Sequence, residues 1–463
     1  MTRAAAELPA GGIAGHPGTG QALSARAAMA GLPALTRQLL RYQPESLWDV
    51  DTARLPRRLQ AYRRRARDFA QGTLAPRALT VDVLPHLPAG EVHPQVLELV
   101  RIAALQGWLT DFTPWPLGSC AWLDFRHPLV LRTCLLVEEF SRACGGLMLL
   151  LCANMLGMAP VLLSGQPRLI WRTLRAARRA NLRGEPHLFA FAITEPGAGS
   201  DAEDGHGAAL GKPGVRAARA RGGWLLNGEK LFISGGDLAR QLTVFAALEG
   251  EGFESWTCFL VDSDAPGFER VRTELKMGMR ASGAAQLRFK DVFVADRALV
   301  GGLRRGWALN RSTLNISRTP VGAMGVGFAQ AAVDVAVAHA CATRLGGRPL
   351  IDFQDVQQAL AQMIADTSAA RALVWQSAST WRPRQGAASI AKFHCTDTAI
   401  NVIHQAMDLV GERAVLHRTR LEKIYRDARL TQIFEGTNQI NRLSVIEDLQ
   451  EELLGRIATG ART

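Results

Sequence analysis

Apolar residues recur at helical spacing along most of the chain, and this pattern breaks only between about residues 188 and 300. Before the break, apolar side chains return every three or four positions, which predicts helices that bury one face. After the break the same period resumes in longer segments, whose lengths and connections suit a four-helix bundle. The predicted helices cover residues 55–68, 94–108, 128–163 and 168–183 before the break, and 307–341, 353–381, 387–410 and 438–455 after it.

The segment from His187 to about residue 300 has the pattern of strands. Short apolar runs alternate with turn residues such as Asn227-Gly228. We predict a small all-β unit and not a parallel nucleotide-binding sheet, because no glycine-rich loop opens a βαβ unit. The predicted strands are Leu188–Thr194, Trp224–Asn227, Leu231–Ser234, Thr243–Ala247, Thr257–Val261 and Leu287–Val294.

The 463 residues therefore divide into three packed units with short ends. The first twenty residues are rich in Ala, Gly, Pro and Thr, so we expect them to be disordered. The expected boundaries are a disordered N-terminus over 1–20, an N-terminal helical domain over 21–187, a β domain over 188–300, a C-terminal helical bundle over 301–455 and a tail over 456–463.

Composition is that of a soluble protein, with 48% hydrophobic and 21% charged residues. Seven scattered cysteines form no CxxC pair and no Cys/His ligand spacing. We therefore expect a reducing, cytoplasmic compartment and no metal site. The apolar run Leu147–Leu163 contains Asn154 and Pro160, which favours a buried helix over a membrane span.

The formal net charge of +12 comes almost wholly from arginine, because the chain has only six lysines. This charge suits an acidic partner or a phosphate-bearing cofactor, although a coding bias toward arginine explains it equally well. The helix predicted over Arg168–Arg183 is strongly basic. No basic region is interleaved with aromatic residues, so nothing indicates a nucleic-acid surface.

One carboxylate, Glu435, has the surroundings of a catalytic base. It follows the apolar pair Ile433-Phe434 and precedes the turn Gly436-Thr437, after which a helix is predicted. Thr437 is the expected N-cap of that helix. Partial burial by the apolar neighbours raises the pKa of a carboxylate, which suits the abstraction of a weakly acidic C–H proton. An ordinary capped surface helix is the alternative.

A second candidate site is the turn Thr194–Asp201, which follows a predicted strand. Its glycines allow a ligand to approach the backbone closely, and Thr194 and Ser200 offer hydroxyls to a polar ring edge or a phosphate. A plain surface turn is the alternative here.

Both segments contribute to a wider resemblance. TEPGAGSD at 194–201, LNGEKLFISG at 226–235, SRTPVGAMGVGFAQ at 317–330, SIAKFHCTD at 389–397 and IFEGTNQINR at 433–442 stand in the order typical of the acyl-CoA dehydrogenase family. The resemblance covers residues 95–455. It implies a mainly α fold with a central β-barrel between an N-terminal helical domain and a C-terminal four-helix bundle. It also implies FAD bound between the β domain and the bundle and completed by a second subunit.

The resemblance assigns roles to individual residues. Glu435 matches the catalytic base, and the alternative base position of the family is Ser317, which cannot abstract the proton. The residues that match cofactor contacts are Thr194, Gly199, Ser200, Phe232, Ser234, Thr437 and Gln439. The residues that match the substrate side are Gly436, Arg318 and Asn315.

The chain departs from the family pattern where a neighbouring subunit would hold the distal half of FAD. The expected arginine and phenylalanine are Thr343 and Gly346, and a family glutamine is Asp408. Glu412 follows nearby, and a carboxylate beside a pyrophosphate is unfavourable unless Arg413 or Arg344 compensates.

The resemblance implies FAD-dependent α,β-dehydrogenation of an acyl thioester, with Glu435 taking the α-proton and the β-hydride passing to flavin N5. The acyl group would be attached as a thioester to CoA or to an acidic carrier protein. The electron acceptor would be an electron-transfer flavoprotein or oxygen. We expect a homotetramer or a homodimer. Two alternatives remain. One is a flavin oxidase or monooxygenase on the same fold, and the other is a non-catalytic paralogue with a degraded FAD site.

Overall fold

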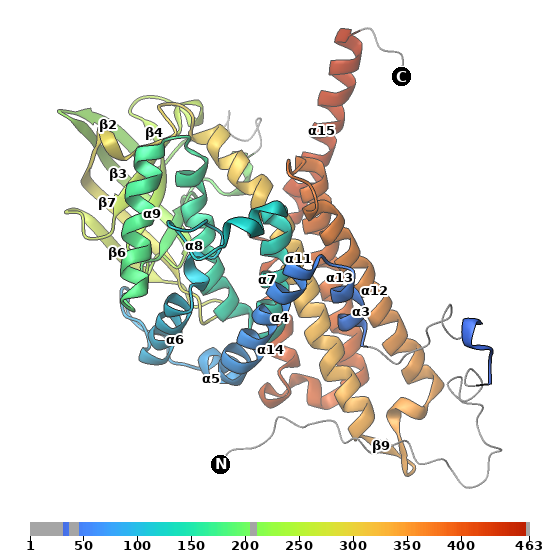
Figure 1. Ribbon diagram of the computed structural model, residues 1–463. Coiled ribbons are helices and arrows are strands. Elements are labelled where there is room, and N and C mark those ends of the chain that lie inside the picture. The colour runs from blue at the N-terminus through green and yellow to red at the C-terminus, as the bar shows by residue number, and fades with distance from the viewer. Residues whose placement is uncertain (1–30, 37–45, 204–210, 460–463) are drawn as a thin grey trace. The chain divides into compact units, whose positions relative to one another are not determined.

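The computed structural model describes residues 31–36, 46–203 and 211–459 (Figure 1). The chain divides into two compact units, residues 1–60 and 61–463. The first unit contains α3 (Leu47–Ala53), whose N-cap Ser46 accepts a hydrogen bond from the backbone N–H of Asp49. Helix α4 (Arg57–Phe69) begins in the first unit and continues into the second. The expected disorder of residues 1–20 concerns a stretch outside the described residues.

The second unit begins with helices, as the sequence predicts. The predicted segment 128–163 is two helices, α7 and α8, because Cys144 between them has an extended backbone. After α4 come the π turn η1 (Ala70–Leu74), the 3-10 turns η2 (Ala75–Arg77), η3 (Trp108–Thr110) and η4 (Trp122–Arg126), and the helices α5 (Ala78–Asp82), α6 (Pro94–Leu105), α7 (Leu129–Ala143), α8 (Gly145–Leu163) and α9 (Pro167–Leu182).

Helices α8 and α9 illustrate two burial patterns. Helix α8 is apolar on all sides, and 78% of its most apolar stretch is buried inside the protein. Helix α11 (Gly306–Ala342) is also long and apolar enough to cross a bilayer, but 72% of its most apolar stretch is buried. Both therefore have the pattern of core helices. Helix α9 is amphipathic, with Leu169, Leu174 and Ala177 buried and its arginines on the opposite face.

The β unit is one mixed sheet of eight strands. Its central strand β4 pairs in parallel with β1 and β2 and antiparallel with β5. Both faces of β4 are buried, which explains its almost continuous apolar sequence. The strands are β1 (Phe189–Ala192), β2 (Arg216–Ala220), β3 (Gly223–Ser234), β4 (Gln241–Leu248), β5 (Thr257–Asp262), β6 (Phe268–Thr273), β7 (Ala284–Ala295) and β8 (Leu299–Val300), with the 3-10 turns η5 (Ser200–Glu203), η6 (Phe253–Ser255) and η7 (Asp296–Ala298) between them.

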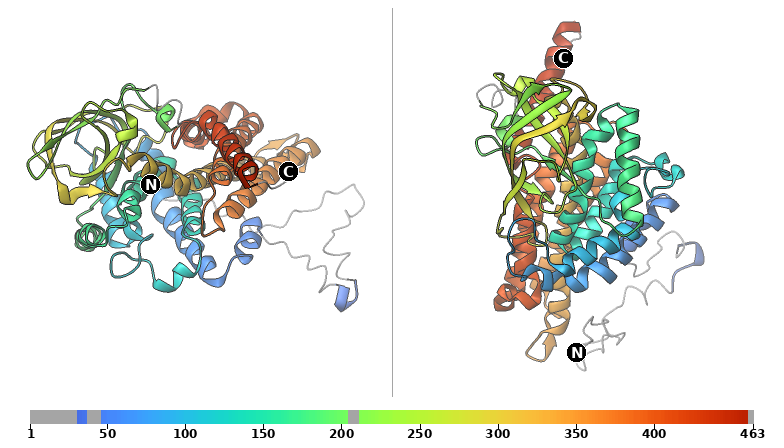
Figure 2. Two further views of the ribbon diagram at one scale, coloured as in Figure 1. Left: turned by 90° about the horizontal axis from the view of Figure 1, so that it is seen from above. Right: turned by 90° about the vertical axis from the view of Figure 1, so that its left-hand side faces the viewer.

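The predicted fold class is confirmed, but the sheet expected to form the central β-barrel does not close. The sheet is strongly curled (Figure 2), yet its path of paired strands begins at β6 and ends at β8. No pairing among the described residues joins those two strands. Strand β8 is only two residues long, so it offers few backbone groups to a closing ladder.

The C-terminal helices form the predicted bundle. Helices α11, α12 (Gln354–Ala378), α13 (Gln385–Val410) and α15 (Asn438–Thr459) agree closely with the predicted segments. Helix α13 contacts the other three, and α11 also packs against α7 and α8 of the N-terminal helices. The expected tail begins four residues before the end of α15. Between these helices lie β9 (Arg344–Leu345), β10 (Arg348–Pro349), η8 (Leu350–Asp352), η9 (Gly411–Val415), η10 (His417–Thr419) and α14 (Leu421–Leu430).

A buried ion-pair network joins α4, α7 and α12. The carboxylate of Glu138 accepts hydrogen bonds from Arg63 (Nη2 to Oε1, 2.9 Å) and from Arg371 (Nε to Oε1, 2.9 Å). Arg63 also donates to Glu139 (Nε to Oε1, 3.1 Å). All four side chains are at most 2% exposed. The Arg371 and Arg63 guanidinium groups hold the pKa of Glu138 below its usual range, although burial acts in the opposite direction.

Glu138→Gln should destabilise the protein strongly, by about 3–5 kcal/mol, because it leaves two buried guanidinium charges without their shared carboxylate. Denaturant-induced unfolding at pH 7 measures this loss. A depressed carboxylate pKa stabilises the folded state above the unfolded pKa, and this stabilisation disappears as pH falls. The difference between wild type and variant should therefore shrink in acid. Glu98→Gln, at an exposed position of α6, is the control and should change little.

Candidate active site

A cavity of about 330 Å³ lies between α7, α8, α11 and the segment that follows α12. Its walls are mainly apolar, with Val137, Leu149 and Met324 among the lining residues. Among the described residues Glu435 is the one carboxylate on its wall, and Ser234 at the end of β3 is a further lining residue. The cavity therefore brings together two predicted site residues that are about two hundred positions apart in the sequence.

The backbone of Glu435 is in the left-handed region, with φ of 57°. Gly436 follows with φ of 76°, so two successive residues have a conformation that L-residues rarely adopt. The surrounding structure holds this loop in place. Buried Lys392 donates from Nζ to the carbonyl of Gly436 and to Oδ1 of Asn438, each at 2.7 Å. The side-chain amide of Asn441 also donates to the carbonyl of Gly436, at 2.9 Å.

Thr437 is the N-cap that the sequence predicts. Its hydroxyl accepts the backbone N–H of Ile440 at 3.3 Å, and α15 begins at Asn438. Asn438 in turn donates to Oδ1 of Asp397 on α13 at 2.8 Å. The start of α15 is thus fixed to α13 by side-chain hydrogen bonds.

The carboxylate of Glu435 has a direct partner in Ser317 on α11. The hydroxyl of Ser317 donates to Oε2 of Glu435 at 2.5 Å. Burial raises the pKa of Glu435, whereas the Ser317 hydrogen bond and the charges of Arg318 and Lys392 act to lower it. The sequence identified Ser317 only as a position that cannot serve as the base, and its contact with Glu435 was missed.

A buried ion pair fixes the turn Thr194–Asp201 against β3. Lys230, which is fully buried, donates to Oε1 of Glu195 at 2.6 Å and to the carbonyl of Ile193 at 2.8 Å. Glu195 also accepts the backbone N–H groups of Gly214 and Val215. The predictions did not include this pair.

This arrangement leaves an aromatic face and two hydroxyls available to a ligand. Phe232 is 59% exposed and has φ of 55°, close to the end of β3. The hydroxyls of Thr194 and Ser234 have no hydrogen-bond partner within the described part of the chain. Together they offer a stacking surface and polar contacts to a flat, polar-edged ring.

The remaining predicted residues lie around this centre. Arg318 is buried and donates from Nη1 to the hydroxyls of Ser389 (3.1 Å) and Ser444 (3.4 Å). Arg318 and Asn315 do not belong to the cavity lining. Gly199 and Gln439 are exposed, and Ser200 begins the turn η5. The cofactor and substrate roles of these residues remain predictions.

The positions that depart from the family pattern gather at one end of α11. Thr343 follows this helix directly, and its Oγ1 lies 3.3 Å from Nδ1 of His339. Glu412 and Arg413 act electrostatically on the same histidine, so η9 lies near it. Gly346 is in the turn of the exposed β9–β10 hairpin. None of these residues lines the cavity.

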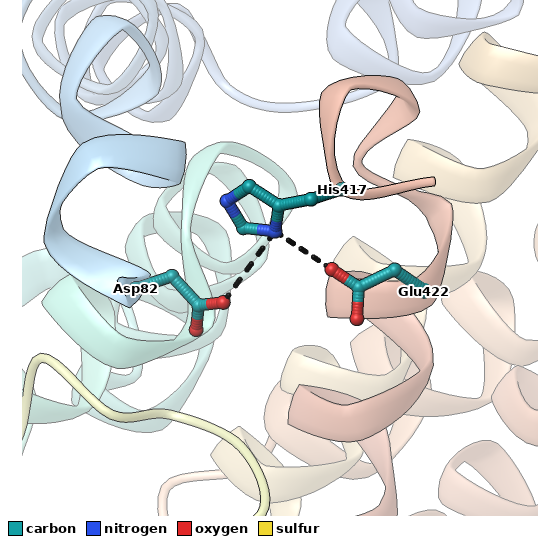
Figure 3. A group of neighbouring side chains, drawn as sticks. All are labelled: Asp82, His417 and Glu422. Carbon is teal, nitrogen blue, oxygen red and sulfur yellow. Dashed lines mark hydrogen bonds and ion pairs between the residues drawn. The ribbon is translucent and has the colours of Figure 1, made fainter. Parts of the chain in front are cut away.

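A second cluster of titratable groups lies away from the cavity (Figure 3). Nδ1 of His417 lies 2.8 Å from Oε1 of Glu422 and 3.8 Å from Oδ2 of Asp82. Arg426 donates to both carboxylates at 2.6 Å, so one guanidinium is shared between them. The cluster therefore acts as an ion-pair network that ties α5 to α14.

Comparison with known proteins identifies the class of enzyme. The acyl-CoA dehydrogenase N-terminal, middle and C-terminal domains match residues 57–178, 190–292 and 304–450. Cyclohexane-1-carbonyl-CoA dehydrogenase of Geobacter metallireducens is 30% identical over 390 residues, which cover 83% of this chain and 96% of that protein. The chain belongs to the acyl-CoA dehydrogenase family, as the sequence motifs indicated.

Solved structures agree with this assignment. Butyryl-CoA dehydrogenase from Megasphaera elsdenii has a TM-score of 0.76 and 29% identity, covering 86% of this chain and 99% of that chain. An acyl-CoA dehydrogenase from Bacillus anthracis in complex with FAD has a TM-score of 0.76 and 25% identity, covering 87% and 68%.

Enzymes of this family are FAD-dependent oxidoreductases that act on CH–CH bonds. The residues of this chain fit the flavin ring. Phe232 would stack on its face, and the unpaired hydroxyls of Thr194 and Ser234 would donate to or accept from its polar edge. Glu435 lies on the wall of the same cavity that Ser234 lines.

Lys230→Met should weaken FAD binding by about tenfold or more. A tenfold loss corresponds to about 1.4 kcal/mol of binding free energy. The substitution leaves Glu195 buried without its cation, and the Thr194 turn loses its attachment to β3. Equilibrium titration with FAD measures the dissociation constant. Lys290→Met, at an exposed position of β7, is the matched control. An unchanged affinity in folded Lys230→Met protein would contradict the assigned role.

Proposed function

We propose that this protein catalyses FAD-dependent α,β-dehydrogenation of an acyl thioester, with Glu435 as the base. The observation that supports this most is the position of the Glu435 carboxylate on an apolar cavity wall, with its pKa raised by burial. A raised pKa strengthens a carboxylate as a proton acceptor, provided that it remains ionised at working pH. The Ser317 hydrogen bond favours the ionised form.

The protein groups divide the work between binding and proton transfer. The apolar walls take the acyl chain and exclude water, which strengthens electrostatic interactions at the reacting carbons. The backbone N–H of Glu435 makes no hydrogen bond within the described residues, so it is available to the thioester carbonyl. That contact would acidify the α-carbon, whose proton passes to Glu435. Bound FAD supplies the acceptor for the β-hydride.

The protein would work as a homotetramer or homodimer in the cytoplasm, with an electron-transfer flavoprotein or oxygen as electron acceptor. Support for a second copy comes from α15, whose apolar residues remain exposed at helical spacing. Leu443 is 57% exposed, and Ile446, Leu449 and Leu453 are 40–50% exposed. Large exposed apolar stripes mark interaction surfaces.

Glu435→Gln should leave FAD binding intact and slow flavin reduction by substrate by about 10²–10⁴, the usual contribution of a general base. The side chain keeps its size but loses its proton affinity. Stopped-flow absorbance of the flavin measures the reduction rate under anaerobic conditions. Reduction near the wild-type rate would exclude Glu435 as the base. If the folded wild-type protein bound no FAD, this would instead favour the alternative of a non-catalytic paralogue with a degraded FAD site.

Ser317→Ala should move the acid limb of the flavin-reduction profile to higher pH by about one pH unit. Ser317 stabilises the ionised carboxylate, so its removal raises the pKa of Glu435, and the active form then appears only at higher pH. A hydrogen bond to a charged group is worth about 1.5–3 kcal/mol, and one pH unit corresponds to about 1.4 kcal/mol. Ser317→Thr retains the hydroxyl and should keep the wild-type profile. Coincident profiles for the alanine variant would show that the contact does not tune the base.

A further inference from the structure

The cavity has a closed end and an open end. At the closed end Val137, Leu149 and Met324 are at most 6% exposed. At the open end Leu163 is 42% exposed and Trp381 is 63% exposed, and both also line the cavity. An acyl chain attached to a large carrier must therefore enter past Leu163 and Trp381.

Three arginines without a carboxylate partner among the described residues stand close in sequence to residues that line the cavity. We call Arg126, Arg382 and Arg384, together with Trp122 and Trp381, the rim. Arg382 and Arg384 stand beside Trp381 in the exposed segment between α12 and α13. Arg126 precedes the cavity-lining Leu129 by three residues, so it lies within about 10 Å of it along the chain. Trp122, in the same turn η4 as Arg126, is 63% exposed.

The rim arginines differ from those surface arginines that form ion pairs. In the described residues no carboxylate pairs with Arg126, Arg382 or Arg384. Elsewhere the exposed guanidinium groups of Arg288 and Arg304 pair with Glu229 and Glu251. The carboxylates of the described residues thus leave the positive charge of the rim uncompensated.

The basic face of α9 is a second group of exposed arginines, which follows the cavity-lining Leu163 in the sequence. Helix α9 contacts α8 and begins four residues after Leu163 (Figure 1). Its exposed arginines lie in one row, because they recur every three or four positions, and the row spans about 16 Å. Trp171 beside them is 47% exposed, and the guanidinium of Arg175 lies 5.7 Å from its ring centre. The row consists of Arg168, Arg172, Arg175 and Arg179.

We propose that the rim and the α9 row form the docking surface for an acidic carrier protein that delivers the acyl thioester into the cavity. This inference rests on the proposed function, because it names the carrier of the same substrate. Exposed tryptophan and arginine are the residue types that dominate protein–protein binding energy. Two groups of arginines near one opening carry more positive charge than the binding of a single small anion needs. Such a charged surface suits a protein of opposite charge.

The test compares three substrates with the same acyl group: hexanoyl-pantetheine, hexanoyl-CoA and hexanoyl loaded on an acidic acyl carrier protein. The rim variant is the triple charge reversal Arg126→Glu, Arg382→Glu and Arg384→Glu. It should lower kcat/KM for the carrier-bound substrate by more than tenfold and leave kcat/KM for hexanoyl-pantetheine unchanged.

In the wild type, kcat/KM for the carrier-bound substrate should fall steeply with salt, since docking between exposed charges is screened. Arg418→Glu, at an exposed position of η10, is the control and should behave as wild type.

Other outcomes overturn the proposal. Equal losses for hexanoyl-CoA and the carrier-bound substrate would assign the rim to the phosphates of CoA, and no loss for either would make it a solvated surface.

Calorimetric titration with the carrier protein tests docking without turnover, and the rim variant should bind at least tenfold more weakly. Carrier binding without oxidation of any of the three substrates would show that the proposed function fails while the docking surface stands. A single-stranded oligonucleotide that binds more tightly than the carrier would assign the surface to nucleic acid.

Discussion

Two buried lysines determine how the site is assembled. Lys230 and Lys392 are both 0% exposed, and a buried ammonium costs several kcal/mol unless acceptors surround it. Lys230 has its acceptors in the Thr194 turn, and Lys392 has its acceptors in the Glu435 loop. Each lysine therefore forces an irregular backbone segment into one position. The stacking face on β3 and the carboxylate at the start of α15 depend on these two attachments.

Helix α7 separates the cavity from a charged core. Val137 lines the cavity, while the next residue, Glu138, turns to the buried guanidinium groups of Arg63 and Arg371. Both faces of this helix are therefore buried, one in apolar contact with the cavity and the other by ion pairs. Because the ion pairs join α7 to α4 and α12, they also fix the wall against which an acyl chain would lie. The stability of the helical core and the shape of the cavity are thus linked through one helix.

The sequence predicted the helices well because long apolar periods identify helices that pack on a core. The β unit was predicted less completely. Strand β2 (Arg216–Ala220) consists of arginine and alanine, and strand β6 (Phe268–Thr273) is interrupted by Glu269, Arg270 and Arg272, so neither has a strand-like apolar run. The sheet ends at β8, which has only two residues. A strand of this length is too short to show an alternating pattern of apolar and polar residues in the sequence. Family resemblance suggested a barrel, and the pairing of this particular chain corrected it.

The centre of the site was predictable from motifs, whereas its supporting contacts were not. Glu435 and Ser234 lie on one cavity, as their motifs implied. The hydrogen bond between Ser317 and Glu435 joins residues 118 positions apart, and spacing within a motif cannot indicate such a contact. A weak indication did exist for the lysines, since Lys392 stands among apolar residues of a predicted helix, where a charged side chain needs a buried partner.

The departures from the family pattern affect a different part of the molecule from the chemistry. Thr343, Glu412 and Arg413 lie around His339 at the end of α11, and none of them lines the cavity. Burial and the nearby charge of Arg413 lower the pKa of His339, whereas Glu412 acts to raise it. By resemblance, this is where a neighbouring subunit would hold the distal half of FAD. If these assignments hold, the distal grip on FAD and the proposed proton transfer at Glu435 would depend on separate groups of residues, so that one could diverge while the other is kept.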